Sequence, residues 1–441
     1  MRTDGSSRFS PDNRYATFPS VALAWRMAEE NFIKKYPAIS ELKLRGSFGV
    51  TGNNNIGDFS YQSYQQTANY VLGAGNGARV FGFSPNGLAV RGLGWETNTQ
   101  FDAGFDLGLF RDRIYLTVAA YQRRTTDLLL NQNIPATTGF ANTALANVGE
   151  VRNRGLEFQL NTANVQGKDF TWSSSANLTL NRNEVIALAG QNDQLLYNAV
   201  FGYTGSIQVV SGQPLGVFYG YQQEGIYRDQ ADVDASPRWT ASRAQPGDIK
   251  FKDINGDGLI NDADKTVIGN PFPKFTYGLL NTFGYKNFSL AVTLQGSQGA
   301  DILYGGDRYV FNSPGQTNAR TNMLDRWHSP SDPGDGRTPR ATGNANPLSQ
   351  AFSSYFVYDA SFLRVRNVTL RYNLPNAWAE KAGLQSAGIY ASVQNLYTFT
   401  KYFGYNPEAN NYGNSTTPTY GVDQGSYPMA RTITIGLQAG F

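Results

Sequence analysis

The last thirteen residues of the chain, 429–441 (MARTITIGLQAGF), decide the fold class. Apolar side chains occupy every second position on one face of the strand that this stretch predicts: Ile433, Ile435, Leu437, Ala439 and Phe441. Small and polar residues fill the other face: Thr432, Thr434, Gly436, Gln438 and Gly440. A period of two with one apolar and one polar face is typical of a barrel strand between lipid and a wet lumen. A soluble β-sandwich is the alternative, but it would rarely end so abruptly on an aromatic residue.

The composition of the 441 residues favours strands over helices and excludes several classes of function. Glycine (47), tyrosine (26) and phenylalanine (27) are abundant, and only 16% of residues are charged. This balance suits aromatic-rich strands joined by polar loops. A net charge of +3 is too small to indicate nucleic acid as a partner. The absence of cysteine excludes disulfides and thiolate metal sites, and the single histidine, His328, argues against a histidine-based triad.

The membrane-spanning elements that we expect are strands. The sequence contains no run of about eighteen apolar residues that would indicate a transmembrane helix. A mean hydropathy of −0.41 is compatible with a barrel, because barrel strands alternate between apolar and polar residues. Residues 1–15 (MRTDGSSRFSPDNRY) lack the apolar core of a signal peptide. A barrel without an export signal is a contradiction, so we expect this chain to be the C-terminal piece of a longer protein.

Thirteen segments of the sequence are interpreted as strands, and one helical patch is expected at residues 28–36 (AEENFIKKY). The strands lie near residues 14–26, 40–51, 97–110, 113–128, 151–164, 169–184, 204–211, 215–226, 274–285, 287–298, 361–374, 386–401 and 429–441. Several alternate regularly, such as 97–110, where Phe101, Phe105 and Leu109 interleave with polar or small residues. The segments 204–211 and 361–374 are less regular.

The connections between these strands alternate strictly between short and long. The short ones are residues 27–39, 111–112, 165–168, 212–214, 286 and 375–385, and the long ones are 52–96, 129–150, 185–203, 227–273, 299–360 and 402–428. A transmembrane barrel shows this alternation, with tight turns on the periplasmic side and long loops outside. We therefore predict an all-β fold, an antiparallel transmembrane β-barrel over residues 1–441. An odd count of thirteen leaves an edge strand without its partner, so the barrel is expected to be partial.

Several stretches resemble the SusC/RagA family of TonB-linked outer-membrane transporters. The similar segments are DGSSRF (4–9), YATFPSVALAWR (15–26), LKLRGSFGVTGN (42–53), WETNTQFDAGFDLGLF (95–110), TTDLLL (125–130), NVGEVRNRGLEFQLN (147–161), GQPLGVFYGYQQEGIY (212–227), PGDIKFKDINGDGLINDADKTVIGNPFPKFTYG (246–278), SFLRVRNVTLRYNLP (361–375) and YASVQNLYTFTKYFGYNPE (390–408). They follow in order along nearly the whole chain. The resemblance implies the C-terminal barrel portion of a large outer-membrane barrel that holds a plug in its lumen.

The resemblance also implies a function and partners. The full-length protein would import large nutrients, oligosaccharides first and peptides as the alternative, with a SusD-like surface lipoprotein and the TonB complex, in the outer membrane of a Gram-negative cell. The family's signal sequence, carboxypeptidase-regulatory-like domain, TonB-contacting segment, plug and roughly first nine strands have no counterpart in this sequence. We therefore expect that these 441 residues cannot import anything by themselves.

The sharpest local motif is an EF-hand-like loop at residues 253–264, within the predicted extracellular loop 227–273. Its candidate calcium ligands are the side chains of Asp253, Asn255, Asp257, Asn261 and Asp264 and the main-chain carbonyl of Leu259. They occupy positions 1, 3, 5, 7, 9 and 12 of the loop, with Gly258 at position 6 for the sharp turn. The closing residue is Asp264 rather than glutamate, as in dockerin-like repeats. The alternative is a solvated Asn/Asp/Gly turn without metal.

Two further groups of residues follow from the strand pattern. Aromatic residues near strand ends are interpreted as an interfacial girdle, with plain strand packing as the alternative: Trp25, Trp95, Trp172, Tyr121, Tyr390 and Tyr397. Arg364 and Arg366 share one face of a strand and would line the lumen, because charges facing lipid are costly. Arg371 has the opposite parity and would join them only past a bulge or beyond the lipid band.

Three classes of function remain open at the level of sequence. The first is the barrel of an energised importer, and the second is a non-transporting outer-membrane barrel that serves for binding or structure. The third is an enzyme, for which no nucleophile–base arrangement is visible and His328 lies in a loop (RWHSPSDPGDGR, 326–337). The sequence predicts no catalytic or organic-cofactor residues, and it does not identify the substrate-binding residues.

Overall fold

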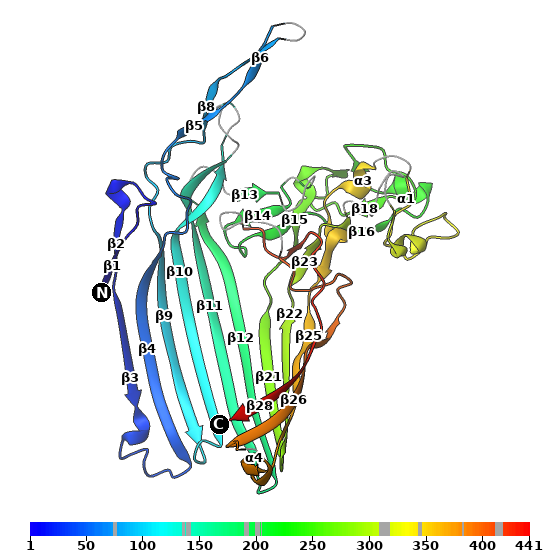
Figure 1. The fold of residues 1–441 in the computed structure, drawn as a ribbon. Helices are drawn as coiled ribbons and strands as arrows, with labels where there is room; N and C mark the ends of the chain where they lie inside the picture. Colours follow the sequence, from blue (N-terminus) through cyan, green and yellow to red (C-terminus); the bar gives the residue numbers. More distant parts are fainter. Residues whose placement is uncertain are drawn as a thin grey trace.

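The computed structural model describes residues 1–73, 77–134, 137, 143–188, 194–198, 203, 205–307, 318–342, 346–381, 383–410 and 418–441. A tall curved sheet forms the body of the molecule, with loops and small sheets gathered at its upper end and tight turns at its lower end (Figure 1). Within the described residues the sheet has eleven strands in the order β28-β26-β25-β22-β21-β12-β11-β10-β9-β4-β3. Each strand pairs antiparallel with its neighbours, so the predicted all-β antiparallel fold is confirmed.

The strands of the main sheet are long enough to cross a membrane. They are β3 (Ser20–Arg26), β4 (Ile39–Asn53), β9 (Glu96–Leu109), β10 (Ile114–Asn133), β11 (Thr143–Gln166), β12 (Phe170–Leu188), β21 (Phe275–Tyr285), β22 (Phe288–Gln298), β25 (Phe362–Asn373), β26 (Ser386–Thr400) and β28 (Thr432–Gly440). A transmembrane strand needs about 9–11 residues, which most of these reach. β10 and β11 run well beyond that length, so the predicted loop 129–150 is partly strand.

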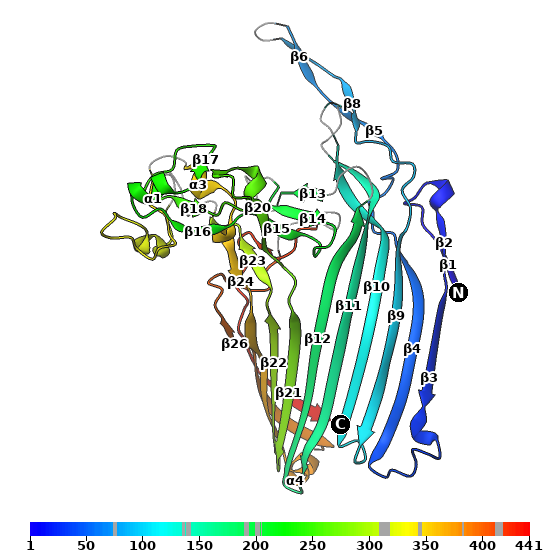
Figure 2. The ribbon, with the colours of Figure 1, turned by 180° about the vertical axis from the view of Figure 1, so that it is seen from behind.

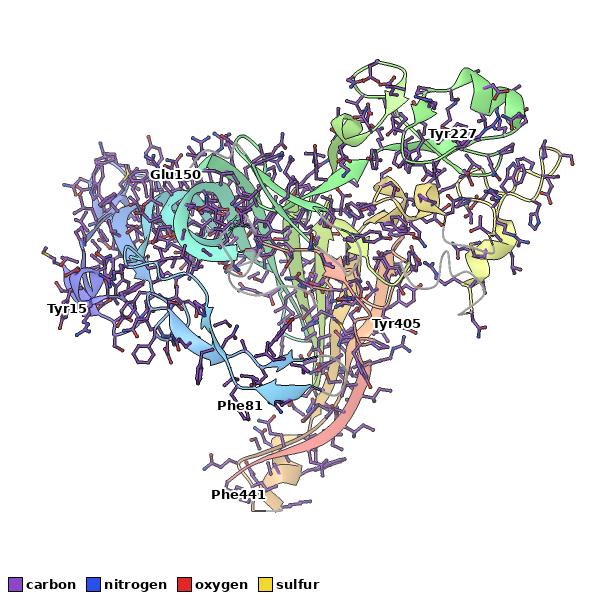
Figure 3. The ribbon with its side chains drawn as sticks, turned by 90° about the horizontal axis from the view of Figure 1, so that it is seen from above. Tyr15, Phe81, Glu150, Tyr227, Tyr405 and Phe441 are labelled. Atoms are coloured by element: carbon purple, nitrogen blue, oxygen red, sulfur yellow. The ribbon has the colours of Figure 1, made fainter. Side chains whose placement is uncertain are left out.

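The sheet is open. β3 and β28 each pair with one neighbour among the described residues, β4 and β26 respectively. Seen from above, the sheet forms an arc, and Tyr15, just before β3, lies far from Phe441, just after β28 (Figure 3).

The prediction of thirteen barrel strands is wrong by two. The segments 204–211 and 215–226 form β14 (Ile207–Val210), β15 (Val217–Tyr221) and β16 (Gln223–Ile226), which lie in small sheets above the barrel. Nearly every residue of β14 and β15 is buried, so neither has the lipid-exposed face that a barrel strand needs. The two predicted loops that flanked these segments are therefore one excursion, residues 189–274, between β12 and β21.

Two local predictions also fail. Residues 28–36 form no α-helix: Met27–Glu29 is a short 3-10 turn, and turns follow it as the chain reverses into β4. The segment 14–26 is not one strand, because Pro19 separates β2 (Tyr15–Phe18) from β3. Proline has no amide hydrogen to donate to a sheet, so it interrupts the ladder.

The alternation of short and long connections holds for the strands of the main sheet, but the predicted short turn 212–214 is wrong, because it joins β14 to β15 outside that sheet. The short turns, 27–38, 110–113, 167–169, 286–287 and 374–385, lie at the lower end of the sheet, and the last of them carries α4 (Asn376–Lys381). The described parts of the excursions 189–274, 299–361 and 401–431 all lie at the upper end (Figures 1 and 2). One end of the sheet therefore carries the turns and the other carries the folded loops.

The strand register gives the sheet two chemically different faces. One row of directly paired residues, on the outward face, runs Trp25, Leu44, Phe105, Val118, Phe158, Leu178 and Tyr277. A row on the opposite, inward face runs Lys43, Asp106, Thr117, Gln159, Asn177, Gly278, Gln295 and Arg364. On β28 the outward residues Ile433, Ile435 and Leu437 are at least 70% exposed, as expected of side chains that face lipid.

The predicted aromatic girdle is partly correct. Trp25 and Tyr397 are exposed on the outward face, and Trp172 stacks on Phe283 there, with ring centroids 5.8 Å apart. Tyr121 instead faces inward and donates a hydrogen bond to Asn181 (3.0 Å). The other two also differ from the prediction: Tyr390 lies on the inward face, and Trp95 packs between Phe9 and Phe18. These differences arise because proximity to a strand end does not specify a face.

The folded excursions form an upper lobe with its own apolar core. Its elements are β13 (Gln194–Tyr197), β14, β15, β16, α1 (Gln230–Ala235), β17 (Arg238–Trp239), β18 (Ile249–Phe251), β19 (Leu259–Ile260), β20 (Lys265–Gly269), β23 (Asp301–Tyr304), α3 (Pro347–Gln350), β24 (Val357–Asp359) and β27 (Val422–Asp423). The core of the lobe includes Phe218, Phe251 and Phe356, all at most 2% exposed. Burial of such a core holds the lobe in a defined shape over the barrel.

The N-terminal region and the first long loop stand on the other side of the upper end. β1 (Arg2–Gly5) pairs with β2 above β3. The loop 54–95 rises as a finger with β5 (Tyr64–Thr67), β6 (Tyr70–Leu72), β7 (Ala78–Val80) and β8 (Phe83–Asn86) (Figure 2). Many side chains of the finger are exposed, including Tyr70 and Phe83 at 70% each.

Candidate functional site

A cavity of about 640 Å³ opens where the inward face of the sheet meets the upper lobe. Inward residues of β12, β21 and β22 form its floor: Asn177, Thr276, Gly278, Thr293, Gln295 and Ser297. Loop segments 271–273, 300–302, 407–410 and 420–421 form its other walls. The cavity therefore lies in the lumen, at the end of the barrel that carries the long loops.

The lining of the cavity is mainly amide, hydroxyl and aromatic. The rings of Phe272 and Tyr420 contact each other with centroids 5.3 Å apart and an angle of 52° between their planes. Charged residues are few: Asp301, Arg366 and Glu408. A concave site with aromatic rings and a few polar groups is the usual form of a small-molecule site.

Arg364 fixes the loop that forms one wall of the cavity. Its guanidinium is 1% exposed, forms an ion pair with Glu408, and donates to the Thr398 hydroxyl (2.9 Å) and the Asn406 amide oxygen (3.3 Å). Its carbon Cζ also lies 4.9 Å from the ring centroid of Phe362. Since β25 and β26 carry Arg364 and Thr398 while Asn406 and Glu408 belong to the loop, these contacts tie the loop to the barrel wall.

A second cluster of contacts lies among the excursions. Asp307 is buried, pairs with Arg320 and accepts a hydrogen bond from the Tyr358 hydroxyl (2.7 Å). The Arg320 guanidinium lies 3.7 Å from the ring centroid of Phe403. Burial raises the pKa of the Asp307 carboxyl, and the bond from Tyr358 and the charge of Arg320 oppose that shift. Asp307, Arg320 and Tyr358 belong to the excursion 299–361 and Phe403 to the excursion 401–431, so the cluster ties together two excursions that also contribute walls of the cavity.

A register shift in β25 determines which of its arginines face the lumen. The register shifts between Val365 and Asn367, so Arg366 is an extra residue opposite β22. Arg366 lines the cavity and donates to the Asn395 side-chain oxygen (3.1 Å). Past the shift, Arg371 pairs with Ser289 on the inward face, as Arg364 does with Gln295. The prediction that Arg371 joins Arg364 only past a bulge is confirmed.

The EF-hand-like loop lies at the outer part of the upper lobe, and its side-chain oxygens face backbone amides. Asp253 accepts from the amides of Gly256 (2.7 Å) and Gly258 (2.8 Å), and Asp257 accepts from Leu259 (2.8 Å). Asp264 is fully buried and accepts from Ile254 and Asn261, both at 2.9 Å. These bonds hold the pKa of Asp253 below its usual range, with the Gly258 amide as the main cause.

The remaining predicted ligands follow the same pattern. Asn255 accepts from the Asp257 amide (3.0 Å), and Asn261 accepts from Ala263 (2.9 Å). The carbonyls of Gly258 and Ile260 accept from Arg238 and Thr240 on the neighbouring strand. Neighbouring carbonyls of an extended strand alternate in direction, so the Leu259 carbonyl points away from the strand that carries Arg238 and Thr240. The loop has oxygen atoms of the kind that calcium prefers as ligands. A carboxylate oxygen that accepts one hydrogen bond keeps a further lone pair, which could bind a metal ion.

No group of three or more His, Cys, Asp or Glu side chains among the described residues is arranged as a metal site. None of the helices described in the structure is long and apolar enough to span a membrane. His328 lies in the upper loops, with its Nε2 atom 3.4 Å from the Leu324 carbonyl oxygen.

Sequence reasoning missed most of the cavity lining. Phe272, Gln295, Glu408 and Tyr420 come from a strand and two loops that only the folded chain brings together. The inward parity of Gln295 was readable from the alternation of 287–298, but nothing in the sequence indicates which loops cover it.

An antiparallel sheet with an apolar outward face, a polar inward face and every folded loop at one end defines a transmembrane β-barrel of the outer-membrane class. Comparisons with known proteins agree with this class. Residues 1–396 match the family described as TonB dependent receptor-like, beta-barrel. TonB-dependent receptor P3 of Formosa agariphila is 36% identical over 445 residues, which is 100% of this chain and 43% of that protein.

Two further similarities lead to the same family. TonB-dependent receptor SusC of Bacteroides thetaiotaomicron is 34% identical over 452 residues, covering 100% of this chain and 42% of that protein. A structure of the RagAB peptide transporter is similar with a TM-score of 0.82 at 26% identity, over 100% of this chain and 45% of that chain. The chain therefore belongs to the TonB-dependent receptor β-barrel family, and the resemblance to SusC and RagA is confirmed. It spans less than half the length of these relatives.

Proposed function

We propose that this chain forms part of the barrel wall and the upper lobe of an importer of large nutrients in the outer membrane of a Gram-negative cell. The observation that supports this most directly is the cavity of about 640 Å³, which joins the polar lumen to the long-loop end. A substrate captured among the loops would meet the inward residues of β21 and β22 next. The family supports the same reading, since its members are outer-membrane proteins and the relatives are named as receptors and transporters rather than enzymes.

Oligosaccharides are the substrate class that we propose. The tilted rings of Phe272 and Tyr420 offer apolar faces to a sugar ring, and Asn177, Thr293 and Gln295 offer donors and acceptors for its hydroxyls. Peptides are the second candidate. They are favoured by the similarity to a structure whose title names a peptide transporter, and by Arg366, which could pair with a peptide carboxylate.

The proposed importer depends on partners. We propose that a SusD-like surface lipoprotein covers the long-loop end and that the TonB complex supplies energy from the periplasmic side. The similarity to SusC and to the RagAB structure supports both. The upper lobe, with its packed core, offers a firm surface at the end where a lipoprotein would sit.

Uptake by cells whose outer membrane carries these residues as the barrel portion of a complete importer tests the substrate proposal. Tyr420→Ala and Gln295→Ala should each slow growth on a large glycan as sole carbon source, because each removes a wall of the cavity. Gln438→Ala is the matched control, since Gln438 faces inward on β28 but does not line the cavity. Growth on glycan should fall roughly tenfold at limiting concentration if one good contact is lost.

The outcomes separate the candidates. Slower growth on peptides, with growth on glycans unchanged, would replace the oligosaccharide proposal with the peptide one. Uptake that none of the cavity variants alters would favour the alternative, a non-transporting outer-membrane barrel for binding or structure.

We also propose that residues 253–264 bind calcium through Asp253, Asn255, Asp257, Asn261, Asp264 and the carbonyl of Leu259. The oxygen-rich loop and its turns at Gly256 and Gly258 support this. Calorimetric titration of the protein with calcium, compared with Asp253→Ala, tests it. Asp234→Ala is the control, because Asp234 lies in α1, outside the loop. Equal calcium uptake by the protein and by Asp253→Ala would mean that the loop is only a turn.

A further inference from the structure

The outward face of the sheet carries a group of arginines just above its apolar region. Arg154 of β11 and Arg182 of β12 lie directly opposite each other in the strand register. The next outward pair toward the turn end is Leu156 and Leu180, which belongs to the apolar face. Both arginines are exposed. They therefore lie at the boundary between the lipid-facing residues and the long-loop end.

Neighbouring arginines on this face have carboxylate partners, but these two do not. Arg124 pairs with Glu150 at 2.6 Å, and Arg152 pairs with Glu184 at 2.7 Å. Among the residues that the structure describes, Arg154 and Arg182 form no ion pair or side-chain hydrogen bond. Like charges directly opposite on paired strands repel each other and destabilise the sheet. The pair is therefore a place where an anion would stabilise the folded barrel.

A hollow of about 600 Å³ lies beside Arg182 at the same height. Lys274 lines it from just before β21, Phe275 and Gln298 line it from β21 and β22, and Asp301 and Asp359 line it as well. The two carboxylates would repel an anion, so we place the charged group of the ligand near Arg154 and Arg182. The deeper part of the hollow would take uncharged polar groups of the same ligand. This arrangement suits a phosphate that is attached to a sugar or polyol.

We propose that Arg154 and Arg182 bind the phosphate of a lipid head group in the outer leaflet of the membrane. Arginine presents a planar set of donors that matches phosphate, and basic residues at a membrane boundary attract anionic head groups. Leu156 and Leu180, directly below, would contact the acyl chains of the same lipid. This proposal rests on the proposed placement in an outer membrane with the long loops outside.

Lipid that remains with the protein tests the proposal. We compare a complete importer that contains this barrel portion with its Arg154→Gln/Arg182→Gln variant after purification from outer membranes in a zwitterionic detergent, and measure lipid phosphorus by mass spectrometry. The variant should retain roughly tenfold less phosphorylated lipid, as expected when about 1.4 kcal/mol of binding is lost. The control Lys168→Gln/Lys286→Gln removes two exposed cations from the turns at the opposite end of the sheet and should retain as much as the unaltered protein. Equal retention by all three proteins overturns the proposal, and so does an equal loss in the control.

Thermal stability in detergent gives a second measurement that a purely structural role would not reproduce. Without anionic lipid, Arg154→Gln/Arg182→Gln should be at least as stable as the unaltered protein, because the repulsion between the two charges is gone. Adding lipid A, or phosphatidylglycerol as a simpler phospholipid, should stabilise the unaltered protein more than the variant, and inorganic phosphate should act on both alike. A variant that is less stable without lipid, or a response to inorganic phosphate equal to that with lipid, contradicts the proposal. Glycan uptake is measured in parallel, so a failure of the lipid site is distinguished from a failure of the proposed transport.

Discussion

Arg364 links the barrel wall to a loop through one buried side chain. Its guanidinium is 1% exposed, so its charge depends on Glu408, Thr398 and Asn406 for compensation. Sequence reasoning placed Arg364 on the lumenal side, because a charge facing lipid is costly. It did not identify the partners in residues 402–410, because an ion pair across 44 positions leaves no local pattern.

Removal of Glu408 should loosen the cavity wall. Glu408→Ala leaves the Arg364 charge buried without its carboxylate, which costs about 3 kcal/mol. We expect faster proteolysis within residues 402–410 and a lower unfolding temperature in detergent. Glu29→Ala, which removes an exposed carboxylate that pairs with Arg26 and Lys34, should change stability little. Equal effects of the two variants would mean that the buried pair contributes no more than a surface one.

The lowered pKa of Asp253 predicts the pH range over which its loop is ordered. The ionised carboxylate is favoured in the fold by the amides of Gly258 and Gly256, so its pKa is lower folded than unfolded. Its contribution is therefore present above about pH 4, the ordinary value for aspartate, and is lost as pH falls through the lower folded value. Hydrogen exchange at the two glycine amides measures this. Protection that is already lost at about pH 5 would contradict it.

At the scale of elements, the sequence predicted which face each residue of a strand occupies. It did not predict which strands belong to the barrel sheet. The period of two is imposed by the backbone, so the alternation in 429–441 and 97–110 gave the correct faces of β28 and β9. The segments 204–211 and 215–226 are also strands, but whether a strand joins the barrel depends on what covers both of its faces. The shift at Arg366 likewise changes the parity of every later residue of β25, and no residue type announces it.

The assignment of faces predicts opposite effects of one charge at neighbouring positions of β22. Val292 faces outward in a row with Val368 and Val393, and Ala291 faces inward opposite Thr369 and Thr282. Val292→Arg should destabilise the barrel by roughly 2–4 kcal/mol, as arginine does on the lipid face near the midplane. Ala291→Arg should cost much less, since its charge reaches the lumen. Denaturant unfolding in lipid vesicles compares the two, and similar losses would mean that the faces are assigned wrongly.

At the scale of the whole molecule, the sequence predicted that the long loops share one end of the sheet. The number of residues between successive strands gives each loop length, and successive antiparallel strands turn at alternate ends. The sequence could not predict the upper lobe, whose core joins residues as distant as Leu130 and Val422. The cavity depends on that lobe, because its roof consists of loops that only tertiary packing brings over β21 and β22. A polar lumen with the long loops at one end was therefore predictable from the sequence, and the residues that line the cavity were not.

The open sheet predicts how these 441 residues behave without other protein around them. β3 and β28 are edge strands in the described structure, and each unpaired backbone group in hydrocarbon costs several kcal/mol. We therefore expect that the chain, exported with an added signal sequence, neither inserts as a stable monomer nor supports uptake of a large glycan. Heat-modifiability on gels and growth on that glycan measure the two expectations. A compact, heat-modifiable monomer that restores growth would show that the two edges can be paired or covered by this chain itself.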